Sequence, residues 1–413
     1  MMKCIIIVLL SVSFFSAVAQ VKKIRIDPAN GMGGAASKYF SDVEFIPLET
    51  TKESLFGEIE HLEVTDQYYI VYDNATDAML FFEKTGKYHH KITNFKFDRM
   101  FKRIPNPTHP QGSVISFTVD PIKKWLYIQS AFESDYLYIY DYEGKRKGKF
   151  KLPADMTDYC LLTDGSFYYR LSRPSRRDRA GKSHPPYELA YHKDTTSPLN
   201  YIYPIDTTKM ASGDDINGHP HYLFGFTGDS TCMFTPDIDY NIYELNAGGI
   251  KNQYQILFPQ QVSLPANFAT DPAYYKKWDA YMKEHKVIGG ILGAYKSGNN
   301  LLLIFAMPVT DYAKAGFYYE LYNLKSSRLI SLNNIAPDAK TFQLPVSHPM
   351  RSGILACGNN NLYFSYPSNI MFGFKESFGD KPPLFNAALS NYFKTQDRKS
   401  NPVILRLKVK SDI

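Results

Sequence analysis

A repeated unit of four short strands separated by tight turns restricts the fold of this chain more than any other sequence feature. The clearest copy spans residues 58–92, with turns at Thr65–Gln67 and Lys84–Lys87. A second copy spans residues 114–152, where Asp120-Pro121 forms the corresponding first turn. Gly, Pro, Asn and Asp favour turns, whereas aromatic and β-branched runs favour strands. Each unit is therefore predicted to be a small antiparallel sheet.

Weaker copies of the unit extend the repeat along the chain. Six units of about 40 to 60 residues predict an all-β six-bladed β-propeller of four-stranded antiparallel blades, because radial repetition leaves only short sheet edges. The 32 Tyr and 28 Phe suit such strands, and charged residues at 21% exclude a disordered chain or a coiled coil. The further first turns lie at Thr163–Gly165, Thr227–Asp229, Lys296–Asn299 and Gly358–Asn360.

The last unit has only three strands of its own, at Ile354–Cys357, Leu362–Tyr366 and Val403–Val409. Upstream of the first unit, Val43–Leu48 is a strand without a partner. We predict that this N-terminal strand is the outermost strand of the last blade, since a ring closed in this way has no long free edge. One insertion, residues 271–286, begins with Asp271-Pro272 and predicts a short helix.

Residues 1–19 are predicted to be a signal peptide. Lys3 precedes an apolar run from Cys4 to Phe15, and Ala17–Ala19 offers a small-residue cleavage site. The run is shorter than the roughly 20 apolar residues of a membrane-spanning helix. Residues 20–413 are thus expected to form one exported domain in the periplasm or outside the cell, monomeric and not membrane-spanning. A net charge of +6 is too small at this length to indicate a nucleic-acid partner.

Four short segments carry a resemblance to a known family. They are Val43–Thr50, Gly57–Ile59, Lys84–Lys87 and Asn401–Val403. Together they resemble the secreted six-bladed β-propeller family of Gram-negative envelopes, which is similar in shape to TolB-like and NHL propellers. The resemblance covers essentially the whole mature chain, but Pro105–Gly112 replaces a Gly-rich segment of the family. It implies the fold and export, and it implies no particular activity.

Loop lengths predict which face of the ring carries a site. In a four-stranded blade, the links between second and third strands and the links between blades open on one face, and the tight hairpins open on the other. Long loops in compact domains are usually functional, so we expect any ligand on the first face, over the central channel. Alternatively, these loops only cap the funnel. They comprise residues 94–112, 171–186, 206–221, 259–286, 307–316, 337–350 and 367–401.

Arginines in or beside the third unit's long loop are the strongest candidate binding residues: Arg170, Arg173, Arg176 and Arg177. The forked guanidinium pairs well with carboxylate or sulfate, so this loop would suit a uronate or a sulfated glycan. The alternative is a solvated basic loop. Trp278, in the predicted helix, would either stack on a sugar or pack into the core.

Two pairs of residues are candidates for weaker sites on the same face. His219 and His221 flank Pro220 and would suit a metal or an acid–base site, but no third ligand is evident, so a surface pair is the alternative. Asp237 and Asp239 resemble a weak Ca²⁺ turn without the Gly and remote Glu of an EF-hand loop. We therefore predict no bound metal and no cofactor.

Two classes of function agree with these features. The first is a non-catalytic protein that binds a glycan, a peptide or an envelope protein. The arginines would suit an anionic glycan. The second is an enzyme at the channel mouth, such as a polysaccharide lyase or glycoside hydrolase. The fold does not decide between them. Binding is favoured, because the sequence contains no GxSxG, P-loop, Rossmann or HExxH motif.

Overall fold

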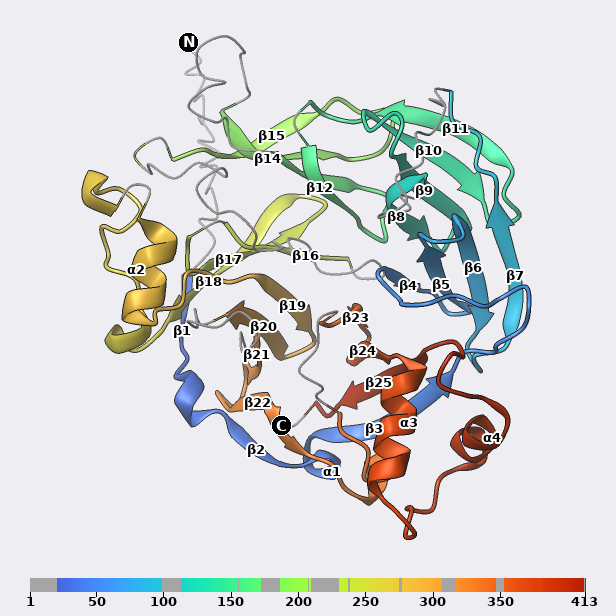
Figure 1. The fold of residues 1–413 in the computed structure, drawn as a ribbon. Helices are drawn as coiled ribbons and strands as arrows, with labels where there is room; N and C mark the ends of the chain where they lie inside the picture. Colours follow the sequence, from blue (N-terminus) through green and yellow to red (C-terminus); the bar gives the residue numbers. More distant parts are fainter. Residues whose placement is uncertain are drawn as a thin grey trace, which may run out of the picture.

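The computed structural model describes residues 21–98, 113–154, 156–171, 186–206, 208, 230–236, 238–274, 277–306, 317–346, 353–411 and 413. In these residues, six sheets are arranged in a ring (Figure 1). The prediction of a six-bladed β-propeller is therefore confirmed. Helices are few and short, and none of those in the described ranges is long and apolar enough to cross a membrane.

Blades 1, 2 and 3 each contain four consecutive antiparallel strands. Their innermost strands are β4, β8 and β12, which come first in each blade. Blade 1 comprises β4 (Leu62–Val64), β5 (Tyr68–Asp73), β6 (Ala78–Glu83) and β7 (Tyr88–Thr93); blade 2 comprises β8 (Val114–Asp120), β9 (Trp125–Ser130), β10 (Tyr136–Asp141) and β11 (Arg146–Lys151); blade 3 comprises β12 (Met156–Leu161), β13 (Phe167–Leu171), β14 (Tyr187–His192) and β15 (Asn200–Pro204).

Blades 4, 5 and 6 combine consecutive strands with strands from the N-terminal segment. In blade 4, Met233 of β16 pairs with Glu244 of β17, just as Leu303 of β20 pairs with Glu320 of β21 in blade 5. Strand β16 therefore occupies the position of the second strand of a blade. Blade 4 comprises β16 (Cys232–Phe234), β17 (Asn241–Asn246) and β18 (Gly249–Leu257); blade 5 comprises β19 (Gly293–Ser297), β20 (Asn300–Ala306), β21 (Phe317–Asn323) and β22 (Leu329–Ala336); blade 6 comprises β23 (Ala356–Gly358), β24 (Asn361–Tyr366) and β25 (Val403–Val409).

The predicted closure of the ring is confirmed. Strand β3 (Phe40–Pro47) pairs antiparallel with β25 and becomes the outermost strand of blade 6. The turn after β6 presses against this strand. Gly86 has a positive φ of 86°, and a Cβ at that position would lie 2.2 Å from the carbonyl oxygen of Pro47. Glycine is therefore required there both by the backbone conformation and by the close approach.

Two further N-terminal strands were not predicted. Strand β1 (Val21–Arg25) pairs parallel with β18 on the outer edge of blade 4, and β2 (Met32–Ala35) pairs parallel with β22 on the outer edge of blade 5. We call residues 21–35 the N-terminal strap. Figure 1 shows β1, β2 and β3 following one another along the rim of three successive blades. One continuous segment thus ties blades 4, 5 and 6 together.

Apolar side chains fill the spaces between neighbouring blades. The rings of Tyr127 in blade 2 and Phe167 in blade 3 lie 5.1 Å apart, and the same centroid distance separates Phe258 and Phe305 between blades 4 and 5. The strands therefore bury both of their faces, which explains their long apolar runs. Three buried cysteines of the described residues contribute to this packing: Cys160, Cys232 and Cys357. Hydrogen bonding to the Cys232 thiol and burial both raise the pKa of Cys160 well above its ordinary value.

The predicted helix at residues 271–286 forms in two pieces. Pro272–Tyr274 is a 3₁₀ turn in which the Asp271 carboxylate accepts a hydrogen bond from the Ala273 N–H, and α2 (Trp278–His285) follows it. Two helices in the last long insertion were not predicted, α3 (Ser368–Ser377) and α4 (Ala387–Thr395), which pack together through their aromatic rings. The short helix α1 (Ala36–Tyr39) links β2 to β3.

Candidate functional site

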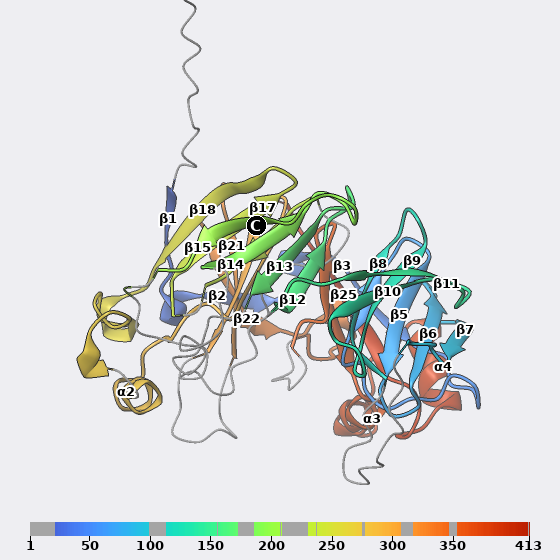
Figure 2. The ribbon, with the colours of Figure 1, turned by 90° about the horizontal axis from the view of Figure 1, so that it is seen from above.

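The two faces of the ring differ in their loops. We call the face that carries the links between blades, and between second and third strands, the loop face, and the opposite face the turn face. Figure 2 shows α2 and α3, which belong to two such links, on the same side of the ring. The turn face carries hairpins such as Lys84–Lys87 and Asn323–Arg328, each closed by a backbone hydrogen bond across the turn. Insertions therefore gather on the loop face.

Polar side chains meet on the loop face where the innermost strands of blades 1, 2 and 3 begin. These strands start from the links between blades and end at turn-face hairpins, so residues at their beginnings lie on the loop face. We call this group the inner-strand cluster. It comprises His61, Glu63, Ser116, Asp158 and Tyr159.

On blade 1, His61 and Glu63 form one half of the cluster. The alternation of a strand places these two residues on the same side. His61 Nε2 lies 3.4 Å from Glu63 Oε1, and its ring stacks on Phe117 of blade 2 with centroids 4.3 Å apart. Glu63 is 3% exposed, whereas about a third of the His61 side chain remains accessible. The imidazole is thus held in place by a carboxylate and an aromatic face.

On blades 2 and 3, Ser116 and Tyr159 form the other half. The Ser116 hydroxyl lies 3.1 Å from the Tyr159 hydroxyl and 3.0 Å from Gln129 Oε1. Burial is the main cause that raises the pKa of Tyr159 far above its ordinary value, and the carboxylates of Asp158 and Glu63 raise it further. Both carboxylates therefore lie within electrostatic range of this phenol. Tyr159 therefore stays protonated at neutral pH, and its hydroxyl oxygen accepts the hydrogen bond from Ser116.

The structure places Arg170 beside this cluster rather than at the surface. Arg170, the second-last residue of β13, lies directly opposite Asp158 in the strand register, and its guanidinium carbon lies 5.8 Å from the centre of the Phe234 ring. Only 6% of Arg170 is exposed. In this arrangement the side chain supports the loop face from beneath, and the predicted direct contact with a ligand would need it to move outward.

Asp239 has a local structural role. Its Oδ1 accepts hydrogen bonds from the backbone N–H of Asn241 at 2.9 Å and from the Asn241 side chain, which orders the start of β17. The carboxylate also contributes to the raised pKa of Tyr203 and Tyr243, whose largest cause is burial. No group of three or more metal-ligating side chains is found in the described ranges.

The other predicted site residues are not brought together by anything the structure describes. Trp278 is the first residue of α2, and its side chain is outside the description. The remaining predicted positions lie outside the described residues: Arg173, Arg176, Arg177, His219, His221 and Asp237.

Sequence reasoning did not nominate the inner-strand cluster. Each of its members stands within a few residues of the start of a first strand, directly after a link between blades. This position in the repeat could have indicated the cluster, because the first strands of successive blades lie side by side around the centre of the ring. The polar identity of His61, Ser116 and Asp158 at three equivalent strand starts would have indicated a shared surface.

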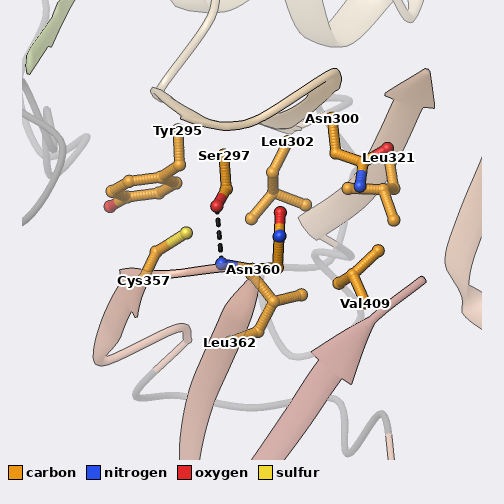
Figure 3. Close-up of a pocket in the computed structure, with 9 residues that line it drawn as sticks. All are labelled: Tyr295, Ser297, Asn300, Leu302, Leu321, Cys357, Asn360, Leu362 and Val409. Atoms are coloured by element: carbon orange, nitrogen blue, oxygen red, sulfur yellow. Dashed lines mark hydrogen bonds between the residues drawn. The ribbon is translucent and has the colours of Figure 1, made fainter. Parts of the chain in front are cut away.

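A small hollow lies between blades 5 and 6, near the turn face (Figure 3). It is lined mainly by apolar side chains such as Leu302 and Leu362, and the Asn360 N–H donates a 2.6 Å hydrogen bond to Ser297 Oγ at its edge. The space accommodates no more than about one water molecule. It is a packing defect between two blades and is too small for an organic ligand.

A family model and one solved structure agree with the propeller architecture. Residues 20–95 match a family model described as "6-bladed beta-propeller". A Bacteroides fragilis crystal structure, described as a "Putative exported protein", is 14% identical over 94% of this chain and 100% of that chain, with a TM-score of 0.65. A Bacteroides thetaiotaomicron protein of unknown function is 10% identical over 92% of this chain and 75% of that chain, with a TM-score of 0.42.

No curated protein matches the sequence. At 14% identity, the Bacteroides fragilis structure shows a shared fold and nothing more specific. The matching family model supports the six-bladed form over the N-terminal segment and blade 1. The fold is therefore established independently of any activity.

Proposed function

We propose that this protein is an exported, non-catalytic β-propeller that binds a glycan on its loop face. In this proposal, acidic groups of the glycan are held by Arg173, Arg176 and Arg177. Export is supported by the predicted signal peptide at residues 1–19 and by the description of the Bacteroides fragilis neighbour as exported. The observation that carries the proposed location is the inner-strand cluster, where polar groups of three blades meet on the face that also bears the insertions.

The chemistry of the cluster favours binding over catalysis. The carboxylates of Glu63 and Asp158 can accept hydrogen bonds from sugar hydroxyls, and the hydroxyls of Ser116 and Tyr159 can both donate and accept them. A Tyr with a raised pKa is a poor general base, so a lyase mechanism gains no support from this phenol. The same two carboxylates would repel an acidic group. We therefore assign uronate or sulfate groups to Arg173, Arg176 and Arg177, in the long loop that follows β13.

The test compares two triple variants that lose the same number of positive charges. Arg173→Ala, Arg176→Ala and Arg177→Ala remove charge from the loop that we predict to lie on the loop face. Lys87→Ala, Lys145→Ala and Arg328→Ala remove it from exposed turn-face hairpins. Binding to arrayed uronate-containing, sulfated and neutral glycans is measured first, and the best ligand is then titrated by calorimetry.

We expect the loop-face triple to weaken binding of the acidic glycan by at least tenfold, and the turn-face triple to leave it within about twofold. A shielded charge-assisted contact contributes about 1.5 to 3 kcal/mol, and a wet one much less. A second pair of variants, Asp158→Asn and the turn-face control Asp66→Asn, tests the cluster in the same way. If acidic glycans bind no form of the protein, or bind both triples equally, the proposal is wrong.

A further inference from the structure

The N-terminal strap covers the outer end of the interface between blades 4 and 5. Ile24 and Ile26 are each 1% exposed and belong to the apolar cluster between these two blades. The Ile26 N–H donates to the Leu257 carbonyl at 3.0 Å, and the chain then turns through the short 3₁₀ helix Pro28–Asn30 to reach blade 5. The strap therefore closes this interface from the outside.

Directly beneath the strap lies a buried carboxyl group, that of Glu320 in β21. Glu320 is fully buried, and it pairs in the strand register with Leu303 on one side and Ser331 on the other. Among the described residues, the Ser331 hydroxyl is the one polar group placed to interact with this carboxyl group, and neither carboxylate oxygen accepts a hydrogen bond of good geometry. An ionised carboxylate without such partners is very unfavourable in a buried position.

Gly31 of the strap lies against this carboxyl group. A Cβ atom added to Gly31 would be 2.9 Å from Glu320 Oε2 and 2.8 Å from the Ser331 Cβ, so only glycine fits. The Asn334 side chain donates to the Gly31 carbonyl at 3.2 Å and holds the backbone over the site. The strap itself is thus what keeps water away from Glu320.

We propose that the N-terminal strap is a pH-dependent latch, which is closed while Glu320 is protonated and opens when Glu320 ionises beneath Gly31. Opening would admit water to the carboxylate and would expose the outer edges of β18 and β22, which β1 and β2 now cover. This device is independent of the proposed glycan site, because the strap lies on the rim of blades 4 and 5.

The groups that face Glu320 are almost all uncharged. On its own strand, Tyr318 and Tyr322 point to the same side, and Ser331 is the polar neighbour on β22. Burial raises the pKa of Glu320 to about 7, and among the described residues the Ser331 hydroxyl opposes this shift. The ion pair of Glu244 and Lys296, in the same interface, contributes nothing to the pKa.

The charged side chains of the strap either form hydrogen bonds with groups other than Glu320 or are exposed to solvent. Lys22 Nζ donates to the Leu324 carbonyl at 3.2 Å, and Lys23 and Arg25 are exposed. The Asp27 carboxylate caps the 3₁₀ helix by accepting from the Ala29 N–H at 3.1 Å. None of these groups compensates a charge on Glu320, so its ionisation acts on the strap alone.

The direction of the effect follows from linkage. A carboxyl whose pKa is raised in the closed state binds more protons there than in the open state, so the closed state loses stability as pH rises. The loss begins above the ordinary value of 4.5 and is complete once pH exceeds about 7. Between pH 5.5 and 8.5 the opening equilibrium should increase about 30-fold if the exposed carboxyl recovers its ordinary pKa.

Hydrogen–deuterium exchange of the full chain tests the latch. Peptides from residues 21–35 are compared with peptides from blade 2, residues 114–151, at pH 5.5 and pH 8.5. Wild type and Glu320→Gln are measured together, because the intrinsic exchange chemistry is the same for both at each pH. Glu320→Gln keeps the shape of the neutral carboxyl and cannot ionise.

We expect protection of the strap to fall about 30-fold in wild type relative to Glu320→Gln between the two pH values, with no relative change in blade 2. Equal strap protection in both proteins at both pH values would overturn the proposal. If Glu320→Gln does not fold, the ratio of strap to blade 2 protection in wild type decides: a ratio that falls with pH supports the latch, and a constant ratio refutes it.

Discussion

Asn401 joins the two ends of the chain through its side chain. It is fully buried, its amide donates to the carbonyls of Glu49 and Ser54 at 2.8 Å each, and its Oδ1 accepts from the Phe56 N–H at 2.9 Å. Asn401→Ala would leave the Ser54 carbonyl and the Phe56 N–H without this partner, each costing about 1 to 3 kcal/mol, whereas the Glu49 carbonyl keeps the hydrogen bond from the Ser54 hydroxyl. We expect a loss of about 3 to 4 kcal/mol in the free energy of unfolding, measured by urea denaturation.

The matched control for this substitution is Asn391→Ala, on the exposed side of α4. An exposed position away from special features changes stability by about 0.5 kcal/mol or less. Similar losses for the two variants would show that the buried amide of Asn401 contributes little.

A buried ion pair connects blades 4 and 5. Lys296 Nζ lies 2.9 Å from Glu244 Oε1, and Glu244 is fully buried. Burial alone would raise the pKa of Glu244, but hydrogen bonds from Asn252, Lys296 and Tyr254 outweigh it and hold the pKa below its ordinary value. In wild type this carboxylate therefore stabilises the fold at neutral pH, and the contribution is lost as pH falls below about 4.5.

Lys296→Met should destabilise the protein by about 3 kcal/mol at pH 7, because it leaves the buried carboxylate with only the more distant and more exposed Lys251. The pKa of Glu244 should then lie above its ordinary value, so the variant should regain stability as pH falls towards 5. Thermal unfolding across this range measures both effects. Lys251→Met, which removes a more exposed lysine 3.6 Å from the same carboxylate, should cost less than about 1 kcal/mol. A flat pH profile for Lys296→Met would contradict this account.

Elements inside the repeat could be predicted from sequence, and elements outside it could not. Strand β3 was predictable because the last unit lacked a strand and Val43–Leu48 lacked a partner. Strand β2 contains Gly33 and Gly34 and shows no alternation of apolar residues. Its position depends on close backbone approach, since a Cβ on Gly33 would lie 2.4 Å from the Asn334 carbonyl oxygen. Gly33 and Asn334 are 301 positions apart, so their contact leaves no recognisable pattern in the local sequence.

The helices show the same division. The end of α2 was predictable, and Lys286 adopts the left-handed conformation that follows many helix ends. The beginning of α4 had a readable signal, because the Asn386 side chain accepts a hydrogen bond from the Leu389 N–H as an N-cap. That signal was overlooked within a long insertion.

The candidate site was the least predictable element. The sequence drew attention to charged residues in long loops, but it does not reveal which of them are buried. Arg170 reads as part of a basic run, and the structure buries it opposite Asp158 and near Phe234. The inner-strand cluster depends on the convergence of three blades, which is a property of the ring rather than of any one segment.

At the scale of the whole molecule, ring closure depends on a few residues at each end of the chain. Strand β25 lies between β24 and β3, so its removal would leave blade 6 without its centre. We expect truncation after Asn401 to abolish cooperative unfolding and to expose apolar faces of blades 1 and 6. Urea denaturation and limited proteolysis measure this, and a truncated protein as protease-resistant as the full chain would contradict it.

The antiparallel pairing of β3 and β25 also determines how the ring responds to mechanical force. Phe40 pairs with Val409 at one end of the ladder, and Pro47 pairs with Val403 at the other. The outgoing chain from Phe40 and the outgoing chain from Val409 therefore leave from the same end. Tension applied through the two flanking segments separates the strands one hydrogen bond at a time, as a zipper opens. The pairing that closes the ring is thus also a place where we expect tension to separate it bond by bond.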